Sequence, residues 1–304
     1  MGKIEITFLG TTAGIPTLQR AHPAIYLRYE GREEFCCLFD CGEGTQRQML
    51  FAGLNFMKIG AIFITHWHPD HYLGLAGLVD TMSFEERKSP LIIFSPELER
   101  TKMFLSLEYH NKRPFEIIYK KVPTEGKKAS LMFQGEEFSI LSIPVVHTVP
   151  AVAYVFVEKD RIKIDKKKLK EKNLPLEGEI YRQVKEKGKV FFNGKEIFLK
   201  DISTCYKGKK VVYSGDTRIC DNLIQIAKDA DLLIQDCTYF DAENFEKYEH
   251  ACLDEIVGFL KKVKVGKVIL THISRRYTDL EQLKEKIKEY PQLEIARDFM
   301  KICI

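Results

Sequence analysis

The stretch that decides the fold lies between residues 61 and 71 and reads Ala61-Ile62-Phe63-Ile64-Thr65-His66-Trp67-His68-Pro69-Asp70-His71. Its first part is apolar and rich in branched side chains, which predicts a buried β-strand. Its second part brings three imidazoles and one carboxylate within six residues. Burial of such groups without partners costs roughly 2–7 kcal/mol each. We therefore expect them to bind a divalent metal, and zinc takes nitrogen and oxygen ligands of this type.

The spacing within this stretch favours two metal ions over one. His66 and His68 are two residues apart, so their side chains leave an extended backbone on the same side. Asp70 and His71 follow a proline turn and can point to a second position nearby. The alternative is a surface histidine cluster that binds metal only adventitiously. The location of the motif at a strand end, outside any low-complexity tail, argues against that alternative.

Three other apolar runs end at residue types that bind metals, namely His147, Asp216 and His272. In α/β proteins, ligands gather where strands end and loops begin. A lone histidine after a strand is more often a satisfied core residue, but a two-metal site needs more ligands than residues 66–71 supply. The expected metal ligands are His66, His68, Asp70, His71, His147, Asp216 and His272. One ion would take His66, His68 and His147, the other would take Asp70, His71 and His272, and Asp216 can bridge ions about 3.5–4 Å apart.

The rest of the chain alternates between strand and helix patterns, which is typical of an α/β fold. Strands are expected over 3–9, 24–29, 35–39, 91–94, 115–122, 129–133, 137–143, 210–217, 230–235, 267–272 and 293–296. Helices are expected over 48–51, 72–80, 97–107, 251–262 and 279–289. The length of 304 residues fits one large α/β domain with an insertion, or two ordinary domains.

Two turns leave their roles open at this point. The loop over residues 10–17 is rich in Gly and small hydroxyl residues, so it can bring backbone N–H groups close to a phosphate or can simply connect two strands. Asp40 and Glu43 lie at another strand-to-helix turn. Either carboxylate can orient a ligand histidine from outside the metal site, or can serve only to cap the turn.

Composition narrows the class of protein. No run of about 18 apolar residues occurs, so no membrane span is expected. The eight cysteines are scattered and no pair has Cys-x-x-Cys spacing, which indicates reduced thiols and a cytoplasmic location. The net charge is only +4, so the chain as a whole is not a generic polycation.

Residues 158–200 differ from the rest of the chain because they are basic and rich in turns. Their basic residues include Lys159, Arg161, Lys163, Lys166, Lys167, Lys168, Lys170, Lys172, Arg182, Lys185, Lys187, Lys189 and Lys195. The segment is predicted to be an arm inserted in the domain. It is either a solvated surface helix, the usual meaning of such a charge run, or an electrostatic handle for a nucleic acid backbone.

Taken together, these motifs resemble the metallo-β-lactamase superfamily and, within it, the ribonuclease Z family of tRNA 3′-processing endonucleases. The superfamily motif His-x-His-x-Asp-His corresponds to residues 66–71. More specific to the family are Gly10-Thr11-Thr12-Ala13-Gly14-Ile15-Pro16-Thr17, Phe39-Asp40-Cys41-Gly42-Glu43-Gly44-Thr45-Gln46-Arg47-Gln48, Ser214-Gly215-Asp216-Thr217 and Thr271-His272-Ile273-Ser274-Arg275-Arg276-Tyr277. The chain departs from the family pattern at Pro69, where Gly is usual, at Asp236, which replaces Glu, and at Cys252.

The resemblance implies a four-layer αββα metallo-β-lactamase sandwich over residues 1–304, in which 158–200 is a tRNA-binding arm. It implies an endoribonuclease that uses two Zn²⁺, or Mn²⁺ or another divalent ion, to cut precursor tRNA 3′ of the discriminator base and leave a 3′-hydroxyl. Asp70 would hold and deprotonate the attacking water, and His250, paired with Asp236, would protonate the leaving oxygen. A homodimer is also expected.

Two other functions compete with this interpretation. One is a small-molecule phosphodiesterase or other hydrolase of the same fold, since fold alone does not determine function. The other is a non-catalytic RNA-binding subunit. The presence of all seven expected ligands argues against the second, and the family-specific runs together with the basic arm argue against the first.

Overall fold

The structure is a computed structural model that describes residues 2–106, 113–175, 177–240 and 248–304. The chain folds into two compact units. The larger unit consists of Gly2–Val157 together with Lys209–Ile304, and the smaller unit consists of Glu158–Gly208. Among the described residues, no helix combines the length and the apolar character needed to cross a membrane.

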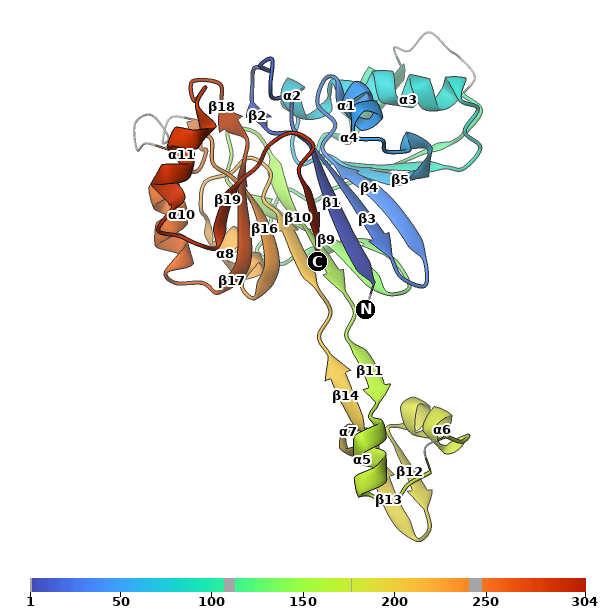
Figure 1. Ribbon diagram of the computed structural model, residues 1–304. Coiled ribbons are helices and arrows are strands. Elements are labelled where there is room, and N and C mark those ends of the chain that lie inside the picture. Colours follow the sequence, from blue (N-terminus) through green and yellow to red (C-terminus); the bar gives the residue numbers. More distant parts are fainter. Residues whose placement is uncertain (1, 107–112, 176, 241–247) are drawn as a thin grey trace. The chain divides into compact units, whose positions relative to one another are not determined.

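The first sheet of the larger unit has seven strands in the order β20-β1-β3-β4-β5-β6-β7 (Figure 1). Its strands are β1 (Lys3–Gly10), β3 (Ala24–Glu30), β4 (Glu34–Phe39), β5 (Ile59–Phe63), β6 (Leu91–Ser95), β7 (Ile117–Lys121) and β20 (Lys301–Cys303). Strands β4 to β7 run parallel to one another. Because parallel strands end at the same edge of a sheet, the turn after β5 opens at the edge where loops can form a site.

The second sheet has seven strands in the order β19-β17-β16-β15-β10-β9-β8. Its strands are β8 (Ser130–Gln134), β9 (Phe138–Val145), β10 (Ala151–Glu158), β15 (Lys210–Tyr213), β16 (Ala230–Asp236), β17 (Val265–Thr271) and β19 (Leu293–Ile295). Strands β15, β16, β17 and β19 are parallel, whereas β10 pairs antiparallel with β15. The turns after β15, β16 and β17 therefore also meet at a single edge.

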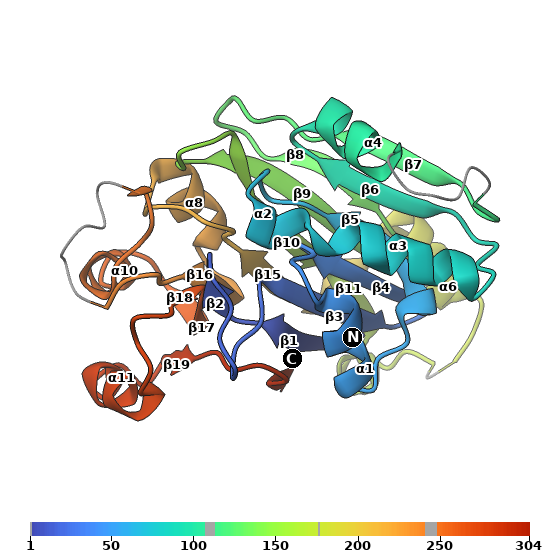
Figure 2. The ribbon, with the colours of Figure 1, turned by 90° about the horizontal axis from the view of Figure 1, so that it is seen from above.

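Helices cover the outer face of each sheet and complete four layers (Figure 2). The helices α1 (Thr45–Phe51), α3 (Gly74–Phe84) and α4 (Leu98–Ser106) pack on the first sheet through one buried apolar cluster. The helices α8 (Asp221–Ala227), α10 (Leu253–Leu260) and α11 (Leu280–Ile287) pack on the second sheet through another. Between the sheets lies an aromatic core that includes Phe8, Phe39, Phe63, Tyr154 and Phe156. The αββα arrangement is thereby confirmed.

Several boundaries differ from those expected. The helix expected over 72–80 is confirmed as α3, but it begins at Gly74 and extends to Phe84, and the separate short helix α2 (Pro69–Tyr72) precedes it. Pro69 occupies the first turn of α2, where proline is favoured because its missing N–H is not needed. Strand β10 was not predicted, because nearly all of its residues are buried and no alternation marks it.

Helix α8 and several shorter elements were also absent from the prediction. The three-residue β20 is too short for any periodicity to show. Within the expected loop over residues 10–17, the short strand β2 (Thr12–Ala13) pairs in parallel with β18 (Ile273–Ser274), and η1 (Phe56–Lys58) precedes β5. The pairing of β2 with β18 joins the loop to the turn after β17.

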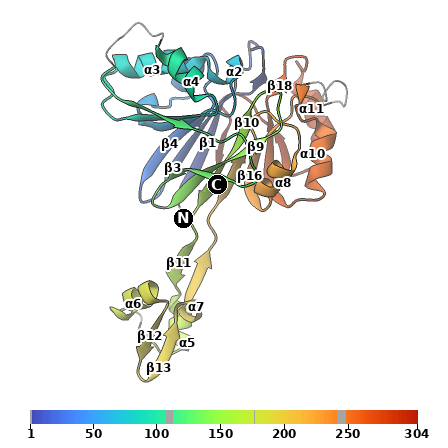
Figure 3. The ribbon, with the colours of Figure 1, turned by 180° about the vertical axis from the view of Figure 1, so that it is seen from behind.

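The smaller unit has its own secondary structure and its own core. Strand β11 (Arg161–Ile164) pairs with β14 (Ser203–Tyr206), and β12 (Lys189–Phe192) pairs with β13 (Lys195–Phe198). The helices α5 (Lys166–Glu171), α6 (Ile180–Lys187) and α7 (Leu199–Ile202) accompany them (Figure 3). Its buried apolar residues are Leu169, Val184, Ile197 and Ile202. The unit carries 15 Lys and Arg residues against nine Asp and Glu residues.

Candidate metal centre

The seven expected ligands all lie at strand ends of the larger unit. They follow β5, β9, β15 and β17 or stand on the short helix α2, and they are His66, His68, Asp70, His71, His147, Asp216 and His272. Their donor atoms form overlapping groups within which all atoms lie inside 4.8 Å of one another. Ligand types from four separate turns and from both sheets thus converge on one place.

The first group consists of three imidazoles. The Nε2 atom of His66 lies 3.0 Å from Nδ1 of His68, and the Nε2 atom of His147 lies 3.1 Å from the same Nδ1. Burial lowers the pKa of His66, and it lowers the pKa of His147 to about 4. These imidazoles are therefore neutral at pH 7, and neutral imidazole nitrogens are metal ligands.

The second group joins Asp70, His71 and His272, with Asp216 between the two groups. Oδ2 of Asp70 lies 3.5 Å from Nε2 of His71 and 3.4 Å from Nε2 of His272. Oδ2 of Asp216 lies 3.2 Å from Nε2 of His71, 3.1 Å from Nε2 of His272 and 3.7 Å from Nε2 of His66. The Asp216 carboxylate is therefore within reach of donor atoms from both groups.

The chemistry of these donors fits a metal. Nε2 of His71 is buried and makes no hydrogen bond among the described residues, although its Nδ1 has a partner. Burial by itself lowers the pKa of His71, but the carboxylates of Asp216, Asp70 and Asp40 outweigh it and raise that pKa well above its usual value. Buried carboxylates that favour positive charge among nitrogen donors are the setting in which a divalent cation binds.

Neighbouring residues hydrogen-bond to the expected ligand histidines on the side away from the other donors. Nδ1 of His71 lies 2.8 Å from Oδ2 of Asp40, which resolves the choice between Asp40 and Glu43 in favour of Asp40. The hydroxyl of Thr65 donates to Asp40 and lies 3.0 Å from Nδ1 of His66. Such partners fix the tautomer and the ring orientation of a ligand histidine.

His272 is supported from the second sheet in a similar way. The hydroxyl of Thr238 lies 2.8 Å from Nδ1 of His272 and donates to Oδ1 of Asp236 at 2.7 Å. Both Asp40 (φ 58°) and His272 (φ 57°) adopt the left-handed backbone conformation. Non-glycine residues seldom adopt this conformation, and such residues cluster at functional sites.

His250 stands beside the ligands without belonging to the two expected ligand triads. Its Nδ1 lies 2.8 Å from Oδ2 of Asp236, a fully buried carboxylate that also accepts hydrogen bonds from the backbone N–H groups of Thr217 and Thr238. Burial lowers the pKa of His250, but the charge of Asp236 and its hydrogen bond more than offset this, so the pKa is raised. The pair can therefore hold a proton close to the metal ligands.

The loop over residues 10–17 contacts the site directly. The backbone N–H of Gly14 donates to Oδ2 of Asp70 at 2.9 Å, and Nε2 of His22 lies 3.2 Å from the Gly14 carbonyl oxygen. The loop thus does more than connect two strands, because it helps to hold one of the expected ligands.

A pocket of about 450 Å³ opens over these groups. Its lining includes His68, Asp70, Asp216, His250 and His272 together with the aromatic and basic residues Tyr239, Tyr248, Arg275 and Arg276. The guanidinium carbon of Arg276 lies 5.0 Å from the centre of the Tyr239 ring. The pocket is open to solvent and bordered by the cations Arg275 and Arg276, which suits an anionic substrate.

Four contacting residues were not singled out in the sequence. Thr65 immediately precedes His66, and Thr238 follows Asp236 by two residues. In both cases the available signal was a hydroxyl residue close to a motif of expected site residues. Gly14 acts through its backbone and could be inferred only as part of a loop. Tyr213, whose hydroxyl donates to Oδ2 of Asp40 at 2.8 Å, lies in an apolar strand and gave no signal.

Comparisons with known proteins agree with this geometry. The family model described as "Anti-Pycsar protein Apyc1" matches residues 4–165, and the one described as "Beta-lactamase superfamily domain" matches residues 202–273. Among solved structures, the metallo-β-lactamase fold protein YhfI from Bacillus subtilis is 17% identical with a TM-score of 0.68, and each chain is covered completely. At that identity the likeness concerns the fold alone.

Closer similarity extends over nearly the whole chain. A protein named ribonuclease Z from Pyrococcus abyssi is 40% identical over 99% of this chain and 96% of its own length. One from Methanosarcina acetivorans is 35% identical over 99% and 98%. The crystal structure of human tRNase Z, short form, is 27% identical with a TM-score of 0.70, and 98% of each chain is covered. The chain therefore belongs to the ribonuclease Z family of the metallo-β-lactamase superfamily.

Proposed function

We propose that this protein is a metal-dependent endoribonuclease that cleaves precursor tRNA 3′ of the discriminator base and removes the 3′ trailer. The observation that carries the proposal is the convergence of seven side chains of metal-ligating types beside the His250–Asp236 pair, next to a pocket of about 450 Å³ that His250 and four of the seven line. Proteins named ribonuclease Z that are 35–40% identical over 99% of the chain support the substrate assignment.

We propose that the resident metals are two Zn²⁺ ions, with Mn²⁺ as the alternative. His66, His68 and His147 would hold one ion, Asp70, His71 and His272 would hold the other, and Asp216 would contact both. When bound, the ions would lower the pKa of water towards neutrality and offset the charge that develops on the phosphate.

The protein side chains would move the protons. Asp70, whose Oδ2 is held by the Gly14 N–H, would take a proton from the attacking water. His250 would donate a proton to the 3′ oxygen that leaves, and its Nε2 is available for this because Nδ1 is committed to Asp236. As the water oxygen bonds to phosphorus and the bond from phosphorus to the 3′ oxygen breaks, the tRNA gains a 3′-hydroxyl and the trailer a 5′-phosphate.

The remaining parts of the proposal concern binding and assembly. The exposed lysines of the smaller unit would contact the tRNA backbone through charge and shape, as folded RNA is usually recognised. We also propose a homodimer and a cytoplasmic location. Free thiols at all eight cysteines are in keeping with a reducing compartment.

The decisive experiment is cleavage of a precursor tRNA transcript by the protein supplied with Zn²⁺ or Mn²⁺, with the cut mapped to the nucleotide and both new ends identified. Wild type should cut after the discriminator base and leave a 3′-hydroxyl. Replacing His250 with Ala should lower kcat by about 10²–10⁴-fold, the usual contribution of a general acid. Metal content, measured by mass spectrometry, should stay the same.

Two outcomes would decide against the proposal. If wild type left precursor tRNA intact but hydrolysed bis(p-nitrophenyl) phosphate, the protein would be a small-molecule phosphodiesterase of this fold. If it bound tRNA and cut neither substrate, it would be a non-catalytic RNA-binding subunit. Loss of metal from His250→Ala would show that this residue binds the metal and is not the acid.

A further inference from the structure

Three hollows of the larger unit form a continuous row that begins at the metal centre. The first is the site pocket described above. The second, the connecting hollow, has a volume of about 320 Å³ and shares Arg275 with the site pocket. The third, the outer hollow, has a volume of about 660 Å³ and shares Thr17, Asp298 and Phe299 with the connecting hollow. A ligand that enters the site pocket therefore has a recessed path along the surface.

Exposed arginines line this path at each stage. Arg275 borders the first two hollows, Arg297 borders the connecting hollow, and Arg47 borders the outer hollow. All three side chains are exposed, and within the described residues none of them makes an ion pair. Arg20, by contrast, is buried and donates to the backbone carbonyl oxygens of Ile273 and Tyr277, so it is not available to a ligand.

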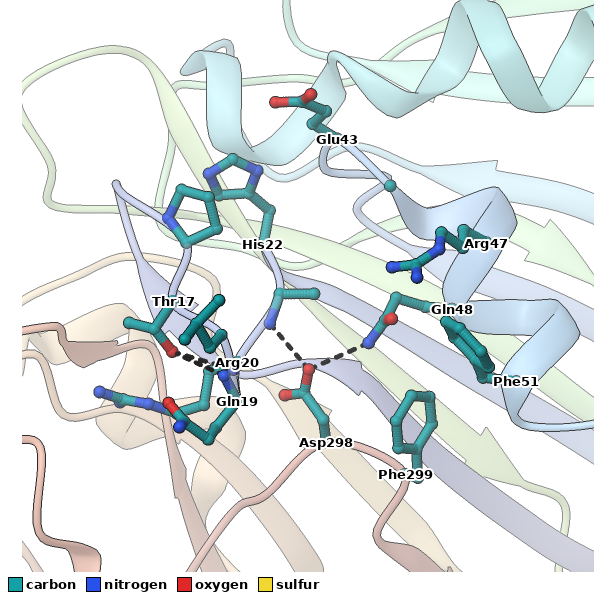
Figure 4. Close-up of a pocket in the computed structure, with 14 residues that line it drawn as sticks. Thr17, Gln19, Arg20, His22, Glu43, Arg47, Gln48, Phe51, Asp298 and Phe299 are labelled. Atoms are coloured by element: carbon teal, nitrogen blue, oxygen red, sulfur yellow. Dashed lines mark hydrogen bonds between the residues drawn. The ribbon is translucent and has the colours of Figure 1, made fainter.

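Within the described residues, the carboxylates that line the connecting and outer hollows (Glu43, Glu281 and Asp298) form no ion pair with these arginines. Glu43 is exposed and offsets one of the three positive charges. Asp298 accepts hydrogen bonds from the Ala21 backbone N–H and the Gln48 amide (Figure 4), and also from the Thr11 hydroxyl. Glu281 is paired with Lys284 on its own helix. The free charge along the row is thus mainly positive, which fits a polyanion.

The outer hollow also offers aromatic surfaces. Phe51 is 61% exposed and Phe299 is 40% exposed, and their ring centres lie 6.2 Å apart in an edge-to-face arrangement. The Arg47 guanidinium lies 4.5 Å from the centre of the Phe51 ring. Figure 4 shows the two rings together at one side of the hollow, with the Arg47 side chain extending over it. Exposed rings beside arginine are the surfaces on which unpaired bases stack.

This combination selects single-stranded RNA over a duplex. Double-stranded RNA is recognised mainly through its phosphates and 2′-hydroxyls, because its bases are stacked on one another and their faces are not open to protein aromatic rings. A single strand presents both a phosphate chain for the arginines and open base faces for the phenylalanines. Recessed hollows that contain aromatic rings are therefore suited to single-stranded RNA.

We propose that the connecting and outer hollows bind the 3′ trailer of the substrate as a single strand. The inference rests on the proposed function. The row leaves the site along the loop that contacts Asp70, because residues 13–17 border the site pocket and the outer hollow in turn. His250, the proposed proton donor to the 3′ oxygen of the tRNA, is held by its hydrogen bond to Asp236. We therefore place the tRNA side of the cut near His250. The trailer, on the other side of the cut, is then the strand that the two hollows bind.

The test compares precursor tRNAs that carry trailers of one nucleotide and of about twelve nucleotides. In the double variant Arg47→Ala/Arg297→Ala, the ratio of kcat/KM for the long trailer to that for the short trailer should fall about tenfold relative to wild type. Phe51→Ala should lower the same ratio, since stacking contributes to binding at each base. The matched control Arg100→Ala/Lys102→Ala removes two exposed cations from α4, away from the row, and should leave the ratio unchanged.

A second measurement does not depend on cleavage. A fluorescent, 5′-phosphorylated trailer oligonucleotide should bind wild type more tightly than the double variant. The salt slope of its binding should fall by about 0.7 for each arginine removed, as expected for single strands. Oligonucleotide binding that depends on Arg47 and Arg297 would support the inference even if wild type failed to cut precursor tRNA, so the two proposals can fail separately.

Three results would overturn the inference. The first is an unchanged trailer-length ratio in the double variant and in Phe51→Ala. The second is an equal loss for short and long trailers, which would assign the arginines to the tRNA body. The third is a shift in oligomeric state by light scattering while the ratio is unchanged, which would identify the surface as a contact between two copies of the chain.

Discussion

The two units of the chain differ in how they use charge. The smaller unit holds 15 basic and nine acidic residues, while the rest of the chain holds 32 basic and 34 acidic residues, so the net positive charge resides in the smaller unit. Thirteen of those 15 basic side chains are exposed. In the larger unit most of the expected metal ligands are buried, with His66, His71 and Asp216 at most 3% exposed.

The difference reflects two physical tasks. Binding a nucleic acid backbone needs many exposed cations, each contributing a little through counterion release, and tolerates loose placement. Holding metal ions needs a few donors at fixed positions, kept in place by buried hydrogen bonds. We therefore expect single substitutions to be severe in the larger unit, whereas the smaller unit should respond to removal as a whole.

The largest effect is expected at Asp216, which lies between both ligand groups. Replacing Asp216 with Asn should lower kcat/KM for precursor tRNA by about 1,000-fold, because losing one member of a buried charge cluster costs roughly 3–5 kcal/mol. Metal content should fall with it, as measured by mass spectrometry. Asp221→Asn, an exposed carboxylate in the first turn of α8, is the matched control. Full activity and full metal content in Asp216→Asn would contradict the assignment.

Removing the smaller unit should have the next largest effect. Val157 and Lys210 are paired neighbours on β10 and β15, so a two-residue Asn-Gly turn can replace residues 158–209. We expect tRNA binding to weaken by about 100-fold at 150 mM salt and its salt dependence to flatten, because many phosphate contacts are lost. Hydrolysis of bis(p-nitrophenyl) phosphate should persist. Unchanged tRNA affinity would rule out the unit as an RNA handle.

A milder effect is expected at Asp40, behind the ligand His71. Asp40→Asn should weaken metal binding by about 10–100-fold, the usual effect of altering a group that orients a ligand histidine. Competition with a chelator measures this directly. Tyr213→Phe removes only one hydrogen bond to Asp40 and should have a smaller effect in the same direction. Equal effects of the two variants would mean that the tyrosine hydroxyl, and not the carboxylate, fixes His71.

The smallest effect is expected at Asp298, away from the metals. Burial raises the pKa of this carboxyl to about 6. A folded-state pKa above the unfolded value favours folding at low pH, and this contribution is lost as pH rises from about 4 through 6. Wild type should therefore lose roughly 1–2 kcal/mol relative to Asp298→Asn over that range, allowing for partial exposure. Urea unfolding at several pH values measures it, and parallel curves would refute the prediction.

The sequence predicted the central strand and the turn that follows it better than it predicted fully buried strands and supporting contacts. Residues 61–71 predicted a buried strand, which β5 confirms, and a turn whose histidines and aspartate lie together in the structure. Both could be predicted because branched apolar residues and clustered imidazoles each have a clear physical meaning. Strand β10 escaped prediction because it is buried throughout and shows no alternation. The partners Tyr213 and Gly14 escaped because one lies in an apolar strand and the other acts through its backbone.

The proposed arm and the candidate site could likewise be predicted only in part. A surplus of lysine is visible in composition, so a basic insertion could be expected near residue 158. Its internal core of Leu169, Val184, Ile197 and Ile202 could not be predicted, because these residues are far apart in the sequence and each stands next to a charged residue. Contacts between distant turns, such as that of Thr238 with His272, depend on the packing of whole strands and become visible only in three dimensions.

The contacts of Asp40 bear on how the candidate site is assembled during folding. It follows β4 of the first sheet, and its Oδ2 accepts from the Tyr213 hydroxyl on β15 of the second sheet while also holding His71. The contacts of Asp40 with Thr65 and His71 lie within the first half, and the Tyr213 hydroxyl adds a support from the second half. His147, Asp216 and His272 also come from the second half, so the cluster of expected ligands is complete only when the two halves have docked. A nascent or misassembled chain would therefore lack the assembled cluster.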